Sequence, residues 1–229
     1  MNRTAQLLIV GFTIILSSCS NNKTNKTPET EIEKVSYSYG VVIASQVISQ
    51  GFDSLDVNAL AKGCNDVLSG NDPYITEEDG MKLLNEFFGK LQAKKQAQAG
   101  AEAAQAGADY LAKNAAKEGV ITTESGLQYE IINSGSGAKP TTTDNVTVHY
   151  HGMLIDGTVF DSSVDRGDPA QFGVTQVIPG WIEALQLMSV GDKWRVTIPG
   201  NLAYGERGAG GIIGPNATLV FEVELLAIN

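Results

Sequence analysis

Three aromatic segments in the C-terminal half of the chain are the residues best suited to chemistry. Residues 177–181 (VIPGW) pass from two β-branched residues through a Pro-Gly turn to a tryptophan. Tyr150 and the pair at 160–161 (FD) precede this run, and residues 203–205 (AYG) follow it. An apolar, aromatic-lined cleft with few polar groups suits an apolar, uncharged substrate such as a proline ring. We therefore expect a pocket whose floor is Trp181.

Two histidines suggest a weaker alternative. His149 and His151 are the two histidines of the chain, and both would lie on one face of a strand, as two metal ligands do. A third ligand is not evident in the sequence, so a pair of surface histidines is the simpler interpretation. The glycine-rich residues 205–214 lack the Gly-Lys-Ser/Thr sequence that cradles phosphate, which favours a loop. We expect neither a metal nor a cofactor.

A serine nucleophile is also disfavoured. Ser162 and Ser163 follow Asp161, but the ordered histidine that activates a serine cannot be assigned. For Trp181 and Tyr204, ordinary core packing is the alternative to a binding role. Neither residue taken alone decides between the two.

Length and composition are those of a globular protein. The 229 residues allow one large domain or two small ones, with 42% hydrophobic and 18% charged residues. The formal net charge is -10, whereas nucleic-acid binding requires a basic face. We therefore expect no nucleic-acid partner.

The chain begins with the pattern of an export signal. A short positive start precedes the apolar residues 7–16, which are too few for a membrane-spanning helix of about 20 residues. The sequence Leu-Ser-Ser-Cys at 16–19 resembles the lipobox of bacterial lipoproteins, in which Cys19 is lipidated. We expect residues 1–18 to be a signal peptide and residues 19–30 a lipidated, flexible tether. A plain secreted protein is the alternative.

Residues 31–91 show the period of amphipathic helices. One helix is predicted from residue 31, a second after an N-cap at Asp56, and a third from Thr76. Cys64 falls on the apolar face of the second helix, so we expect an inert core residue without a disulfide. The apolar faces have little else to pack on in so short a segment, which predicts a homodimerisation domain.

Residues 92–118 continue the third helix with Ala, Gln and Lys and almost nothing to bury. This composition predicts a connecting helix that bridges two domains through solvent. Gly100 and Gly107 are candidate bending points. A disordered Ala/Gln linker is the alternative.

From residue 119 onward the pattern changes to short alternating strands. Strands are predicted within residues 122–132, 146–152, 193–198 and 218–228. A hairpin turn is predicted at Asp156-Gly157, and a short helix at residues 181–188. The predicted class is α+β: an antiparallel sheet with one helix against it, preceded by an all-α domain.

The motifs of residues 119–229 resemble the FK506-binding-protein family of peptidyl-prolyl isomerases. Matching segments occur in order at residues 160–163 (FDSS), 177–181 (VIPGW), 188–192 (MSVGD), 203–205 (AYG) and 214–225 (GPNATLVFEVEL). The front half resembles the N-terminal dimerisation domain of bacterial members of the macrophage-infectivity-potentiator type. The resemblance implies a five- or six-stranded antiparallel sheet wrapped around a short helix.

The resemblance also implies a set of site residues. Four would be catalytic: Asp161, Tyr204, Tyr150 and Trp181. Seven would bind substrate: Phe160, Arg166, Phe172, Val177, Ile178, Ile212 and Phe221. Tyr204 would offer its hydroxyl, and Ile178 its backbone N–H, to substrate carbonyls. Ala170 stands where several members carry an aromatic residue, which leaves one wall of the pocket open.

The expected function is therefore a peptidyl-prolyl cis-trans isomerase that assists the folding of proline-containing exported polypeptides. We expect a homodimer, anchored by the lipid on Cys19 in the cell envelope at the outer membrane, facing the periplasm. Macrolides of the FK506 type are expected inhibitors. The alternative is a lipid-anchored chaperone whose dimer cleft holds unfolded clients with little isomerase activity.

Overall fold

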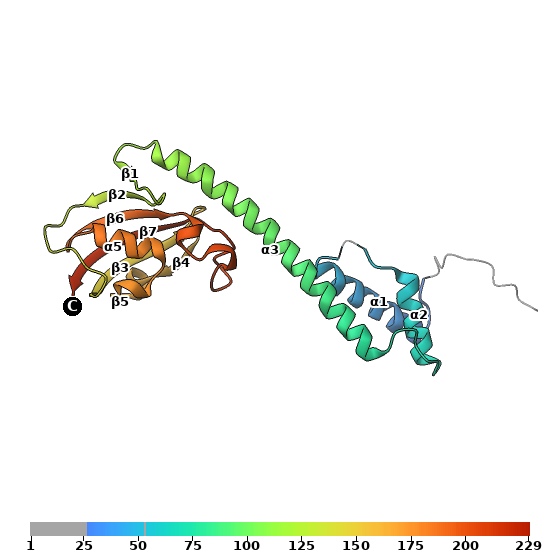
Figure 1. The fold of residues 1–229 in the computed structure, drawn as a ribbon. Coiled ribbons are helices and arrows are strands. Elements are labelled where there is room, and N and C mark those ends of the chain that lie inside the picture. Colours follow the sequence, from blue (N-terminus) through green and yellow to red (C-terminus); the bar gives the residue numbers. More distant parts are fainter. Residues whose placement is uncertain (1–26, 53) are drawn as a thin grey trace, which may run out of the picture. The chain divides into compact units, whose positions relative to one another are not determined.

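The computed structural model describes residues 27–52 and 54–229. The predicted signal peptide, Cys19 and most of the predicted tether lie outside the described residues. The chain divides between Pro73 and Tyr74 into two compact units (Figure 1).

The N-terminal unit contains two helices, α1 (Glu31–Ser49) and α2 (Val57–Leu68). Helix α1 begins with a capping box, in which the Thr30 hydroxyl accepts from the Glu33 N–H and the Glu33 carboxylate accepts from the Thr30 N–H. Helix α2 begins at the predicted N-cap, because the Asp56 carboxylate accepts two backbone N–H groups of the first turn. Hydrogen bonds to the capping side chains therefore determine where both helices begin.

The apolar side chains of these two helices are not buried within the chain. Helix α1 has no buried residue, and α2 buries Asp66, which pairs with Lys62 at 2.7 Å. Large apolar side chains that are exposed on the two helices are Ile32, Val35, Tyr37, Tyr39, Val41, Val42, Ile48, Val57, Val67 and Leu68. Cys64 is also exposed, so the expectation of a core cysteine is wrong for the single chain. The predicted helix is present, but within the described residues the Cys64 side chain is not buried.

The second unit opens with the 39-residue helix α3 (Glu77–Ala115), whose N-cap is Thr76. The helix runs without interruption through Gly100 and Gly107, so the alternative of a disordered linker is wrong. Both glycines are buried, together with Asn114. They are positions where the helix closely approaches the sheet domain, and the C-terminal half of α3 is not a bridge through solvent.

A single antiparallel sheet of seven described strands follows (Figure 1). The strands are β1 (Val120–Thr122), β2 (Gln128–Asn133), β3 (Asn145–Leu154), β4 (Val159–Ser162), β5 (Ala170–Gly173), β6 (Lys193–Ile198) and β7 (Leu219–Ile228). Their order is β1-β2-β6-β7-β3-β4, and β5 pairs with β3. The family resemblance implied five or six strands, whereas the described domain has seven, of which β1 and β5 are only three and four residues long. The predicted turn is present, with Gly157 at φ 88° between β3 and β4.

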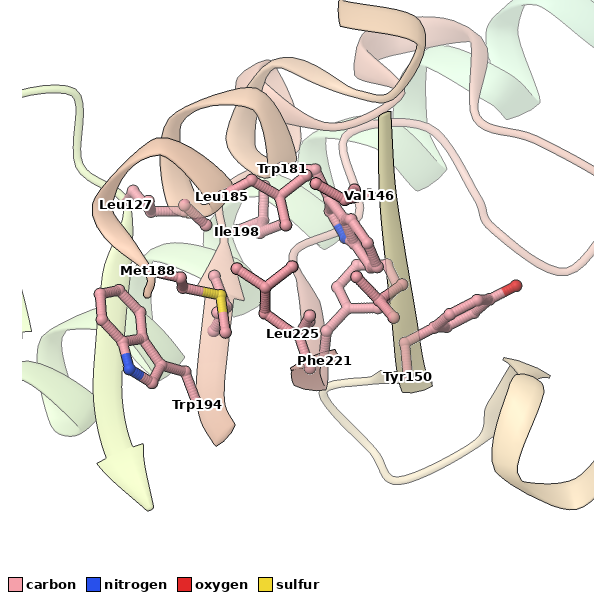
Figure 2. Close-up of a cluster of buried hydrophobic side chains, with 14 of the residues drawn as sticks. Leu127, Val146, Tyr150, Trp181, Leu185, Met188, Trp194, Ile198, Phe221 and Leu225 are labelled. Carbon is pink, nitrogen blue, oxygen red and sulfur yellow. The ribbon is translucent and has the colours of Figure 1, made fainter. Parts of the chain in front are cut away.

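Five short helical segments complete the domain. They are α4 (Ser163–Arg166), α5 (Pro179–Leu187) and the 3-10 turns η1 (Val174–Gln176), η2 (Gly200–Leu202) and η3 (Gly205–Arg207). Helix α5 supplies Trp181, Leu185 and the following Met188 to the core against the sheet (Figure 2). Gly180 permits this packing, because a Cβ there would lie 2.4 Å from Ile198 Cγ2.

Candidate active site

The sheet domain contains a cavity of about 370 Å³ between α5 and the sheet. Its lining residues are Tyr150, Phe160, Asp161, Phe172, Gln176, Val177, Ile178, Trp181, Tyr204 and Phe221. Most of these side chains are aromatic or aliphatic, and the polar atoms come from a few side chains and the backbone. The cavity therefore favours an apolar ligand group.

Trp181 is held by three aromatic neighbours. Its ring lies edge-to-face against Tyr150, Phe172 and Phe221, at centroid distances of 5.5, 5.8 and 5.3 Å. Such edge-to-face pairs fix ring orientation as well as burying area. The indole is 5% exposed and lies beside Phe221 and Tyr150 in the core (Figure 2). It is both a core residue and a wall of the cavity, so the two interpretations of Trp181 are not exclusive.

Local sequence explains how Trp181 reaches this place. Pro179 is the first residue of α5, where its fixed φ is already helical and its missing N–H costs nothing. Trp181 therefore falls in the first turn of the helix, where it lines the cavity. Gly152 serves the opposite wall, because a Cβ there would lie 2.8 Å from both the Phe160 and Phe221 rings.

A polar cluster of three residues occupies one side of the cavity. The Tyr150 hydroxyl donates to the Asp161 carboxylate, and Arg166 donates to both Asp161 and the Tyr150 hydroxyl. Helix α4 positions Arg166: Ser162 caps its start, and Gly167 ends it in the left-handed region at φ 74°. This short helix was not predicted from the sequence, because four residues carry no period.

The cluster holds Asp161 in its ionised form. Partial burial alone would raise the pKa of Asp161, but hydrogen bonds from Tyr150 and Arg166 and the positive charge of Arg166 lower that pKa below its ordinary value. Burial, followed by the hydrogen bond to Asp161, raises the pKa of Tyr150. At neutral pH Asp161 is therefore an anion that accepts hydrogen bonds, and Tyr150 is a neutral phenol.

Two of the predicted site residues do not line the cavity. Arg166 acts through Asp161 and Tyr150, and its guanidinium also lies over the Tyr150 ring at 5.6 Å. Ile212 is 52% exposed on the β6–β7 loop, next to the bridge between Ala209 and Ile213. The other nine line the cavity, among them Tyr204, whose side chain is 41% exposed.

Gln176 lines the cavity and was missed by sequence reasoning. It ends η1 directly before Val177, and its side chain packs over Gly173. Its position directly before residues 177–181 could have indicated that it lies at the cavity. A single glutamine in a loop, however, belongs to no periodic pattern or motif that predicts a binding role.

In the structure Ser162 and Ser163 each lie beside a histidine, which was not predicted from the sequence. His151 Nδ1 lies 2.9 Å from Ser162 Oγ, and His149 Nδ1 lies 3.1 Å from Ser163 Oγ, so each serine does have a histidine partner. Both serines are buried. Ser163 Oγ accepts from the Tyr150 N–H at 2.8 Å, and Ser162 caps α4. They therefore hold β3, β4 and α4 together and are not exposed nucleophiles. Over the residues that the structure describes, no three His, Cys, Asp or Glu side chains gather as a metal site would require.

A small antiparallel sheet packs on one short helix, and the mostly aromatic and aliphatic cavity between them suits an apolar ligand group. Comparison with known families identifies its class. Residues 136–226 match the model described as FKBP-type peptidyl-prolyl cis-trans isomerase, and residues 32–131 match the domain amino-terminal to such isomerases.

Whole-chain relatives agree. The chain is 52% identical over 205 residues to the FKBP-type 22 kDa peptidyl-prolyl cis-trans isomerase of Escherichia coli (strain K12), covering 90% of this chain and 99% of the relative. It is 44% identical over 224 residues to the outer membrane protein MIP of Legionella longbeachae, covering 96% and 95%. The crystal structure of FkpA from Escherichia coli matches with a TM-score of 0.69 at 33% identity, covering 89% of this chain and 99% of that chain.

The chain therefore belongs to the FKBP-type peptidyl-prolyl cis-trans isomerase family, and it is a peptidyl-prolyl cis-trans isomerase. The chaperone alternative is not favoured by these relatives. In the described part of the chain, no helix combines the length and apolarity needed to cross a membrane.

Proposed function

We propose that the cavity binds the prolyl ring of an X–Pro segment over Trp181, and that the surrounding side chains accelerate rotation about the X–Pro bond. The edge-to-face box around Trp181 carries this proposal, because it offers a rigid apolar floor of ring size. Phe160, Phe172 and Phe221 form the walls with Val177. Tyr204 and the Ile178 backbone N–H lie at the cavity as donors for the substrate carbonyls that flank the proline.

The physical reason for catalysis is the electronic change in the amide. The planar X–Pro amide has double-bond character, which makes its rotation barrier about 18–20 kcal/mol. At the twisted transition state this resonance is lost, and the amide becomes less polar. An aromatic cavity poor in water solvates the planar form less well than bulk water does, so it favours the twisted form. A preference of about 1.4 kcal/mol already accelerates rotation tenfold.

The polar cluster contributes orientation and charge without proton transfer. The lowered pKa of Asp161 keeps its carboxylate ionised, and its oxygens are already engaged by Tyr150 and Arg166. The cluster therefore presents a fixed ion pair beside the cavity. A fixed dipole of this kind stabilises the charge distribution of the twisted amide without reorganisation.

An X–Pro peptide assay on the full chain tests these roles. We expect Tyr150→Phe and Tyr204→Phe each to lower kcat/KM by about five- to tenfold, since each removes a hydrogen bond of about 1 kcal/mol or more. Tyr129→Phe is the matched control, because Tyr129 stacks on Trp194 at 4.3 Å and does not line the cavity. An equal loss in all three variants would show that the hydroxyls at the cavity have no special role.

We also propose that the N-terminal unit forms a homodimer. Helix α1 exposes Ile32, Val35 and Tyr39 as well as Tyr37 and Val41, so its apolar residues surround much of the helix. A helix that is apolar on all sides is stable when buried. A second copy of the chain would supply that burial, and the match of residues 32–131 to the amino-terminal domain of these isomerases supports the proposal.

The location and clients rest on the first residues and the relatives. We infer that Cys19 is lipidated and anchors the protein in the cell envelope at the outer membrane, facing the periplasm. One relative is named an outer membrane protein. Proline-containing exported polypeptides are the clients that such a location supplies. FK506-type macrolides would compete for the same cavity, although Ala170 leaves less apolar area on one wall.

A further inference from the structure

The C-terminal half of α3 has one narrow contact face. Gly100, Gly107 and Asn114 are the buried residues of the helix, and they repeat every seven positions. Residues seven apart lie on one side of an α-helix, two turns apart. This face therefore contacts the sheet domain along about four turns, from the β6–β7 loop to strand β2.

The two glycines of this face bring the helix backbone against the β6–β7 loop. A Cβ on Gly107 would lie 2.3 Å from Thr218 Oγ1, and a Cβ on Gly100 would lie 3.1 Å from Pro215 Cβ. By contrast, a Cβ on Gly89, earlier in the same helix, would meet nothing within 4 Å. At Gly100 and Gly107 the absence of a side chain allows the helix backbone to lie against the loop.

The far end of the face is held by a buried amide pair. The Asn114 side chain donates to the Gln128 side chain at 2.9 Å, and Gln128 donates to the Leu111 carbonyl at 3.0 Å. Both amides are more than nine-tenths buried. Gln128 begins β2, so the last turn of α3 is fixed in register with the sheet.

Asn216 joins the helix to the part of the loop that carries Tyr204. Its side-chain amide donates to the Gly100 carbonyl at 3.4 Å, and its backbone N–H donates to the Gly205 carbonyl at 2.8 Å. It has a φ of 54°, and among the described residues it is the one non-glycine residue with positive φ. Asparagine tolerates this region better than most residues. One residue therefore contacts both α3 and the neighbour of Tyr204.

We propose that Asn216 is a positioning residue, through which the docked half of α3 fixes the β6–β7 loop and sets the orientation of Tyr204 at the cavity. This inference rests on the role proposed above for Tyr204. The active site is then built by the sheet domain together with residues 100–114 of the connecting helix. A displacement of the helix would change how tightly the substrate carbonyl is held.

A double-mutant cycle on the full chain tests the coupling. Gly107→Val places a branched side chain against Thr218 and separates helix from loop. We expect it to lower kcat/KM for an X–Pro peptide by about fivefold in the wild-type background, and by less than twofold in the Tyr204→Phe background. Gly89→Val, at an open position of the same helix, is the control for the change in helix propensity and should leave kcat/KM unchanged.

Asn216→Asp provides a second variant that keeps the backbone conformation. It replaces the donor facing the Gly100 carbonyl by an acceptor, and we expect the same dependence on Tyr204 with a smaller loss. Losses that multiply in the double variants, or no loss in either single variant, would overturn the proposal. If Tyr204→Phe alone left kcat/KM unchanged, both the role of Tyr204 and the coupling built on it would be wrong. A loss in Tyr204→Phe with multiplying effects would reject the coupling alone.

Discussion

The sheet domain buries a core of large apolar side chains, whereas helices α1 and α2 expose many of theirs. In the sheet domain, α5 and the inner faces of the strands bury a continuous core that includes Leu127, Trp181, Leu185 and Leu225. In helices α1 and α2, side chains such as Val42 and Leu68 are exposed, and α1 has no buried residue. The sheet domain buries its hydrophobic core within one chain. Helices α1 and α2 leave large apolar side chains exposed in the single chain, and burial of these side chains is the role proposed above for a second copy.

Because of this difference, we expect the stability of the two regions to depend on different factors. The stability of the sheet domain should depend on its own core packing and not on protein concentration. The stability of the helical unit should depend on association, because an interface buried between copies obeys mass action.

The largest expected effect is in the core. Trp181→Ala removes the ring that three aromatic side chains contact. We expect it to lower the free energy of unfolding of the sheet domain by about 3–5 kcal/mol, as for other buried aromatic residues. Chemical denaturation followed by the remaining tryptophan fluorescence measures the change. A loss below about 1 kcal/mol would mean that the aromatic box does not support the domain.

An intermediate effect is expected in helix α1. Val42→Asp places a charge on an apolar position that is 53% exposed in the single chain. If a second copy covers this position, sedimentation should show a shift from dimer to monomer, with a cost of about 1–3 kcal/mol in association. Asn71→Asp adds the same charge in the turn before Pro73 and should leave the dimer intact. An unchanged dimer in Val42→Asp would place the interface elsewhere.

The smallest expected effect concerns the charge at the cavity. The pKa of Asp161 is lowered in the folded protein, so its carboxylate stabilises the fold fully above its unfolded pKa of about 4, and this contribution is lost as pH falls through the folded pKa. The difference in unfolding free energy between wild type and Asp161→Asn should therefore be constant from neutral pH to about pH 5 and shrink below about pH 4. The carboxylate is 45% exposed, so solvent screening keeps the difference small. A difference that grows on acidification would contradict the assigned charge.

Much of the fold followed from local patterns. The N-caps at Asp56 and Thr76, the Asp156-Gly157 turn and the strand alternation of β3 and β7 depend on a few neighbouring residues each, so the sequence predicted them. The family resemblance implied eleven site residues, and nine of them line the cavity. Helix α4 and strands β1 and β5 were not predicted, because three or four residues are too few to show the period of a helix or a strand.

By itself, the sequence determined the elements, the aromatic set and the family, because periods, caps and motifs are local properties of the chain. The tertiary structure decided which of those residues meet. It placed His149 and His151 on the two serines, left Ile212 outside the cavity, and turned Gly100 and Gly107 from expected bends into contacts with the β6–β7 loop. It also left Cys64 exposed. Burial and close approach depend on residues that are far apart in the chain. A local sequence pattern therefore does not predict how distant surfaces pack against each other.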